Sequence, residues 1–133
     1  MSGTLFIVAT PIGNLDDITF RAVSVLKSAD LILAEDTRHS KKLLSHLDVL
    51  TPLQAFHDHN EREKTQFVID ELSAGKSIAL ISDAGTPLIS DPGYVLVSEA
   101  KKANLKVVPI PGPSALIAAL SGAGLASDNF TFF

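Results

Sequence analysis

The sequence predicts an α/β fold with a doubly wound, mostly parallel five-stranded sheet flanked by helices. Three observations support this. The chain has 133 residues and is 46% hydrophobic, which is enough for one substantial core. Five short apolar runs are typical of buried strands, and patterns with helical spacing separate them. A β-α-β-α order favours parallel strands joined by right-handed crossovers. The expected strands cover residues 5–9, 31–34, 53–56, 77–81 and 106–109.

The first strand, residues 5–9, is apolar throughout, which is typical of a strand buried on both faces. A loop rich in Pro and Gly follows at residues 10–14. Apolar residues then recur at helical spacing, which predicts a helix over about 17–28. We expect Asp16 or Asp17 to cap it, because a carboxylate satisfies free backbone N–H groups at a helix start.

The middle of the chain continues the alternation. Residues 31–34 form the second expected strand, and residues 40–47 a helix. Residues 53–56 predict a short third strand. Residues 61–74 are charged and amphipathic, and Gly75 is a typical residue after a helix end.

The last elements begin with the apolar strand at 77–81. The next helix is expected to start around Asp91 and Pro92, because Asp can cap a helix and Pro fits the first helical position. A fifth strand at 106–109 and a helix of small residues at 115–120 complete the order.

Composition excludes several classes of protein. There is no Cys, so disulfides and thiolate metal sites are impossible. No apolar run is long enough to span a membrane and no signal-peptide pattern is present, so we expect a cytoplasmic protein without a membrane partner. The net charge is −4, so any contact with nucleic acid needs a local basic patch. The Phe-rich end, a strand-like run with nothing after it, favours residues 1–133 being one domain of a longer protein.

The loops after the strands hold most of the chemically distinctive residues. Ligands of open α/β sheets bind at the carboxyl ends of the strands. Gly13, Gly85 and Gly112 each lie just past an expected strand and are flanked by Pro. Gly allows close approach of backbone to a ligand, and Pro stiffens a loop. Three such loops on one rim favour a pocket for a small ligand with an amino-acid-like or ribose part, although each alone is also typical of a tight turn.

Several familiar signatures are missing. There is no Walker A sequence, and Gly122–Ser127 lacks the third Gly of a dinucleotide fingerprint and follows a helix. Ser82 is not framed by Gly as a nucleophile elbow would be. His57 and His59 could bind a metal, but spacing of two residues on an extended loop sends them in opposite directions. A polar loop, or contact with a substrate, explains them better, and we expect no metal site.

Five segments stand out when they are taken in order: TPIGNLDDIT (10–19), EDTR (35–38), HDHNE (57–61), SDAGTPLISDPG (82–93) and PIPGPSA (109–115). Together they resemble the tetrapyrrole-methylase superfamily of S-adenosylmethionine-dependent methyltransferases. Within it they most resemble the branch that methylates the 2′-hydroxyl of a cytidine in bacterial small-subunit ribosomal RNA. Corrin and porphyrin methylases usually carry Gly-Pro-Gly-Asp in the first loop, where this chain has ATPIGNLDD, which favours the RNA branch.

The resemblance implies a two-domain enzyme, usually a homodimer, that binds S-adenosylmethionine in a cleft between domains and acts on the small ribosomal subunit. Residues 1–133 would be the N-terminal α/β domain of this methyltransferase, with the C-terminal domain absent, and a fragment with half the cleft should be inactive. The implied cofactor-binding residues are Pro11, Gly13, Asp83, Ala84, Gly85, Thr86, Pro87, Pro111, Gly112 and Ser114. The implied substrate-binding residues are Arg38, Lys41, Asn60 and Glu61.

Individual roles stay open at this point. A ribose hydroxyl must lose its proton to react, and the candidate bases are Asp36, His39, His57 and His59. Asp83 could contact the amino acid part of the cofactor or cap a turn. The alternatives to the RNA methyltransferase are a methylase of a tetrapyrrole precursor and a non-catalytic α/β ligand-binding module.

Overall fold

The computed structural model describes residues 2–89 and 93–133. In these residues the five strands form one all-parallel sheet in the order β3-β2-β4-β1-β5, which confirms the expected α/β fold. Each strand lies within one or two residues of its predicted position. The strands are β1 (Thr4–Val8), β2 (Leu31–Ala34), β3 (Leu53–Ala55), β4 (Ile78–Ile81) and β5 (Lys106–Ile110).

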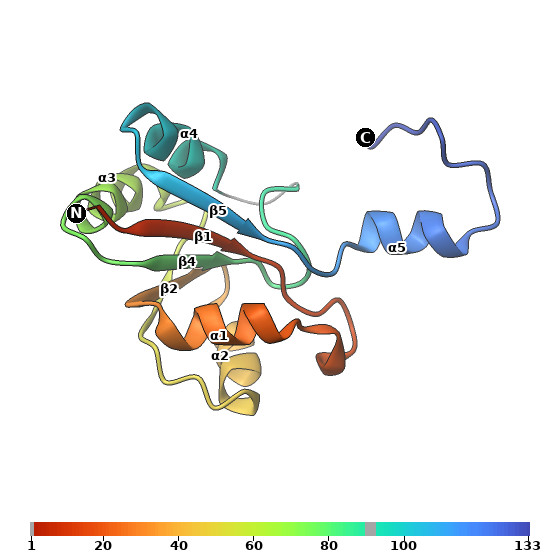
Figure 1. The fold of residues 1–133 in the computed structure, drawn as a ribbon, viewed down its shortest axis with the longest axis horizontal. Coiled ribbons are helices and arrows are strands. Elements are labelled where there is room, and N and C mark those ends of the chain that lie inside the picture. The colour runs from red at the N-terminus through yellow and green to blue at the C-terminus, as the bar shows by residue number, and fades with distance from the viewer. Residues whose placement is uncertain (1, 90–92) are drawn as a thin grey trace.

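Helices cover both faces of the sheet, as a doubly wound fold requires. Figure 1 shows α1 and α2 on one side, α3 and α4 on the other, and α5 beyond the carboxyl ends of the strands. None of the described helices is both long and apolar enough to cross a membrane. The helices are α1 (Phe20–Ser28), α2 (Thr37–His46), α3 (Glu61–Ser73), α4 (Tyr94–Lys102) and α5 (Ala115–Gly122), with a 3₁₀ turn, η1, at Leu15–Asp17.

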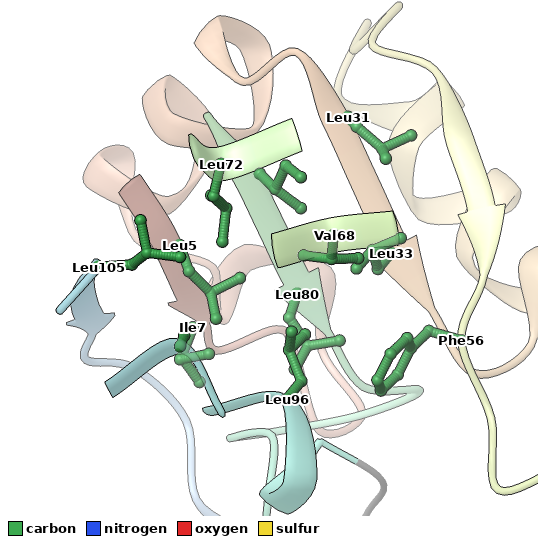
Figure 2. Packing of buried hydrophobic residues seen from close by; sticks show 12 residues of the cluster. Leu5, Ile7, Leu31, Leu33, Phe56, Val68, Leu72, Leu80, Leu96 and Leu105 are labelled. Atoms are coloured by element: carbon green, nitrogen blue, oxygen red, sulfur yellow. The ribbon is translucent and has the colours of Figure 1, made fainter. Parts of the chain in front are cut away.

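The core has two layers because successive strand residues point to opposite faces of the sheet. In β4, Leu80 belongs to the layer under α3 and α4, and Ile81 to the layer under α1 and α2. Every residue of β2 and β4 is buried, as their unbroken apolar sequences predict. Phe56 follows β3 and directs its ring into the first layer, near Leu33 and Leu96 (Figure 2).

Helix α1 begins later than the sequence predicted, and neither Asp16 nor Asp17 caps it. Both lie in the separate 3₁₀ turn η1, which Asn14 caps by accepting a hydrogen bond from the Asp16 N–H at 3.0 Å. Thr19 is the true cap of α1, since its Oγ1 accepts from the Ala22 N–H at 3.0 Å. The extra turn fits between loop and helix because Ile18 returns to an extended conformation after η1.

We expect Thr19→Ala to lower the free energy of unfolding by about 1 kcal/mol, because the Ala22 N–H would lose its acceptor. Asp17→Ala is the matched control, since it changes an exposed carboxylate that caps nothing in the described structure, and should stay within about 0.5 kcal/mol of wild type. Urea titration followed by circular dichroism measures both. An equal loss in the two variants would contradict the assignment of the cap.

Three other helix boundaries refine the sequence analysis. Helix α2 begins at Thr37 and not at Ser40, because Asp36 caps it. Gly75 follows α3 with a φ of 98°, and its N–H bonds to the Leu72 carbonyl at 3.0 Å, which confirms the predicted helix end. Helix α4 begins at Tyr94. The predicted roles of Asp91 and Pro92 lie outside the described residues.

The sheet order sets the position of the site. Strands β1 and β4 are neighbours, but the chain leaves β1 for α1 on one face and leaves β4 for α4 on the other (Figure 1). Their connections therefore diverge at the carboxyl ends. Such a switch point is where doubly wound sheets form a ligand crevice.

Candidate functional site

The loops after β1 and β4 are joined by a short antiparallel bridge between Thr10 and Gly85. The Thr10 N–H donates to the Gly85 carbonyl at 2.9 Å, and the Gly85 N–H donates to the Thr10 carbonyl at 3.0 Å. Gly85 has a φ of 81°, a conformation that favours Gly. The buried Ser82 hydroxyl lies 3.1 Å from the Ala84 carbonyl and 3.2 Å from that of Gly85. These contacts fix the shape of the SDAG turn.

The loop after β5 is fastened to the same group. The Thr86 hydroxyl donates to the Pro113 carbonyl at 2.9 Å. Gly112 lies so close to β1 that an added Cβ would be 2.8 Å from the Cβ of Ala9, which explains the Gly at this position. Ser114 caps α5 by accepting from the Ile117 N–H at 3.4 Å. The three Pro/Gly loops predicted from the sequence are therefore held together on one rim.

A cavity of about 310 Å³ opens among these loops. This volume is near the lower end of the range for small-molecule pockets. Its lining is mostly apolar, with Thr86 and Ser114 supplying hydroxyl groups that already hydrogen-bond to backbone. Polar contacts to a ligand would therefore come mainly from backbone groups. The lining residues are Ile12, Ala84, Gly85, Thr86, Ile89, Ser114, Ala115, Leu116 and Phe132.

Four of the predicted cofactor residues line this cavity: Ala84, Gly85, Thr86 and Ser114. The other six lie on the same three loops without lining it: Pro11, Gly13, Asp83, Pro87, Pro111 and Gly112. Pro87 is buried, and Gly112 packs against β1. Asp83 is exposed, and its carboxylate makes no hydrogen bond to another described residue. The described structure therefore shows no contact in which this carboxylate caps a turn.

The sequence analysis missed the apolar part of the lining. Ile12 stands between Pro11 and Gly13, where a solvated turn would more often carry a polar residue, and this was an available signal. Ile89, Leu116 and Phe132 gave no comparable signal, because their distance from the loops depends on tertiary structure.

The start of α2 brings two candidate bases to the edge of the same rim. Asp36 caps the helix, with its Oδ1 accepting from the Arg38 N–H at 3.0 Å and the His39 N–H at 3.3 Å. The His39 ring reaches across to the β4 loop, where Nε2 lies 2.9 Å from the Asp83 carbonyl oxygen. Arg38 and Lys41 are exposed on α2, beside this contact.

The segment after β3 forms a second group. The His57 and His59 rings meet edge to face with centroids 5.6 Å apart, and Nδ1 of His57 is buried without a hydrogen-bond partner in the described structure. Asn60 closes the turn by accepting from the His57 N–H at 2.9 Å and donating to the Ala55 carbonyl at 3.1 Å. Glu61 accepts from the Gly93 N–H at 3.1 Å.

Asn60 and Glu61 therefore use their side chains to hold backbone groups in place. Neither residue forms a hydrogen bond to His39 in the described structure. Within residues 2–89 and 93–133, no three His, Asp or Glu side chains are grouped closely enough to hold a metal ion. The rim thus combines the three joined Pro/Gly loops with the imidazole side chains of His39, His57 and His59.

Comparison with known proteins identifies the family. The family model for tetrapyrrole (corrin/porphyrin) methylases matches residues 4–131, nearly the whole chain. The chain belongs to this methylase family. The matched range includes all three of the joined loops.

Two relatives have a far higher sequence identity to this chain than proteins that share only a fold. The ribosomal RNA small subunit methyltransferase I of Vibrio cholerae is 61% identical over 128 residues, covering 96% of this chain and 44% of that protein. The protein of the same name from Pseudomonas aeruginosa is 60% identical over 131 residues, covering 98% of this chain and 46% of that protein. The chain thus spans just under half the length of these methylase relatives.

A solved structure supports the fold. The crystal structure of uroporphyrin-III-C-methyltransferase from Thermus thermophilus aligns with a TM-score of 0.72 at 24% identity, covering 95% of this chain and 55% of that one. At this identity the likeness extends to the fold and not to the substrate.

Proposed function

We propose that the protein to which this chain belongs is an S-adenosylmethionine-dependent methyltransferase that modifies the 2′-hydroxyl of a cytidine in small-subunit ribosomal RNA. The observation that carries the proposal is the 61% identity to a ribosomal RNA small subunit methyltransferase across nearly all of the chain. The site is compatible with it, because three stiff loops surround a cavity at the switch point of the sheet.

The residues present fit one wall of a cofactor site. An added Cβ on Gly85 would be 3.2 Å from Ile12 Cγ2. A larger residue at this position would therefore crowd Ile12 and reduce the space beside the cavity. We propose that Ala84, Gly85, Thr86 and Ser114 contact the cofactor directly, while Pro11, Gly13, Pro87, Pro111 and Gly112 hold the loops in shape. Asp83 offers a carboxylate for the amino group of the cofactor. When bound, S-adenosylmethionine supplies an activated methyl group on a sulfonium, so the protein mainly positions the reactants.

The opposite wall of the cleft would come from a second domain. Helix α5 carries no charged residue, and none of its side chains is buried. Ile117 on α5 is 54% exposed and Leu125 just beyond it is 74% exposed. Such an apolar surface is typical of an interface. We propose that residues 1–133 form the N-terminal domain, and that a C-terminal domain covers α5 in a cytoplasmic homodimer.

The substrate edge would lie along α2 and the segment after β3. Arg38 and Lys41 are exposed cations that could meet phosphate, and they offer the local basic patch that a net charge of −4 makes necessary. Asn60 would act there mainly by shaping the turn that presents His57 and His59, and Glu61 by holding the Gly93 N–H before α4.

The test uses full-length protein, methyl-labelled S-adenosylmethionine and small ribosomal subunits that lack the modification. We expect label on a ribose oxygen of a cytidine in the ribosomal RNA, and no transfer from the isolated 1–133 chain. Absence of label on any ribose would contradict the proposal. Transfer to a uroporphyrinoid would favour the tetrapyrrole alternative, and failure to bind S-adenosylmethionine in calorimetry would favour a non-catalytic module.

A further inference from the structure

The contact between His39 and the β4 loop has a chemical consequence. A backbone carbonyl can only accept a hydrogen bond, so His39 Nε2, 2.9 Å from the Asp83 oxygen, must carry the proton. In the neutral ring the other nitrogen, Nδ1, is then a proton acceptor. Nδ1 makes no hydrogen bond to another described residue, and the side chain is exposed at the rim.

We infer that His39 accepts the proton of the ribose 2′-hydroxyl through Nδ1, with the Asp83 carbonyl fixing the ring and its tautomer. The inference rests on the proposed function. The O2′–H bond breaks and its proton moves to Nδ1, which makes the ring a cation. The freed oxygen pair forms the bond to the methyl carbon, and the pair of the former carbon–sulfur bond stays on sulfur. The imidazolium then returns its proton to solvent.

The three other candidate bases are placed less well. Oδ1 of Asp36 already accepts two backbone hydrogen bonds that hold the start of α2. His57 and His59 follow β3, and β2 separates β3 from β4 in the sheet. Strands lie about 4.8 Å apart, so these rings start about two strand spacings from the β4 loop. Among the four, and within the residues that the structure describes, only His39 forms a side-chain hydrogen bond to a loop that borders the cavity.

His39 also has a backbone partner, the Asp83 carbonyl, that can fix the orientation of its ring. A hydrogen bond from one ring nitrogen to a backbone carbonyl fixes the ring and leaves the other nitrogen to act as acceptor, which is a common way to orient an imidazole. Asp83 therefore contributes its carbonyl to orient the ring, while its side chain stays available for the cofactor.

The decisive variant is His39→Gln in the full-length protein. A Gln amide can donate to the Asp83 carbonyl but cannot accept a proton, so the loop should keep its shape while the base is lost. We expect single-turnover methyl transfer to fall by about 100-fold or more, which is the range for removing a general base. The calorimetric Kd for S-adenosylmethionine should stay within about threefold of wild type. His46→Gln is the matched control, because it changes an exposed His at the far end of the same helix.

The outcomes separate this inference from the proposed function. If wild type transfers no label to a ribose, the proposed function fails whatever the variant does. If wild type is active and His39→Gln keeps its rate within about threefold, the inference is overturned. An equal loss of rate and of cofactor affinity would also overturn it, because that pattern belongs to a purely structural residue.

A second readout does not depend on activity. Nitrogen-15 NMR of full-length protein with labelled His, assigned by comparison with His39→Gln, reports the tautomer of the neutral ring. We expect the proton on Nε2 and an unprotonated Nδ1. A ring protonated on Nδ1 would overturn the inference.

Discussion

Replacing Gly85 with valine is expected to weaken binding of S-adenosylmethionine to the full-length protein by more than about tenfold. Gly85 has a φ of 81°, where a β-branched residue is a strong outlier. Its N–H and carbonyl both bond to Thr10, so a change in its backbone would disturb the bridge between two loops. The new side chain would also crowd Ile12, since even a Cβ comes within 3.2 Å of it.

Gly75→Val provides the matched control for Gly85→Val. Gly75 also has a positive φ, 98°, but it ends α3 on the opposite rim. Both variants should lose about 1–3 kcal/mol of stability through backbone strain. Calorimetry on the folded proteins should show reduced affinity only for the Gly85 variant. Equal affinities in the two variants would contradict the placement of the cofactor at the SDAG turn.

Phe56→Ala is expected to lower the free energy of unfolding by about 3–5 kcal/mol. Phe56 is 1% exposed and belongs to the core layer under α3 and α4, with its ring near Leu33 and Leu96 (Figure 2). Truncation would remove this buried apolar surface and leave a cavity in a layer that has little freedom to collapse. Chemical denaturation followed by circular dichroism measures the loss as a lower midpoint with an unchanged slope.

Phe20→Ala is the control for this substitution, because the same side chain is 97% exposed at the start of α1. It should change the free energy of unfolding by no more than about 0.5 kcal/mol. A comparable loss in the two variants would contradict the two-layer core described above.

The strands were predictable because β2 and β4 are buried on both faces, which leaves an unbroken apolar run in the sequence. Helix starts were harder to predict. Asp17 and Thr19 are both good caps, and only the extra turn η1 decides between them. Asp36 is a candidate base, and its position before Thr37 also suits a cap. The structure shows the capping contacts, and the role as a base stays a prediction.

The sequence predicts which loops form the candidate site, but not the contacts and distances between their residues. Alternation of strands and helices places the loops at one end, so Gly13, Gly85 and Gly112 could be grouped from the sequence. The order of the strands in the sheet cannot be predicted from any local sequence pattern. The Thr10–Gly85 bridge and the His39–Asp83 contact both follow from β4 lying between β1 and β2. Phe132, which is distant in sequence from the loops, also lines the cavity, and no local pattern predicts this.

The central claim is that the joined loops form one wall of an S-adenosylmethionine site. A crystal structure of the full-length protein with S-adenosylmethionine tests this most directly. We expect the cofactor in the cavity beside Ala84, Gly85, Thr86 and Ser114, enclosed on its other side by the second domain. A cofactor bound elsewhere, with this cavity filled by the protein's own side chains, would contradict the account.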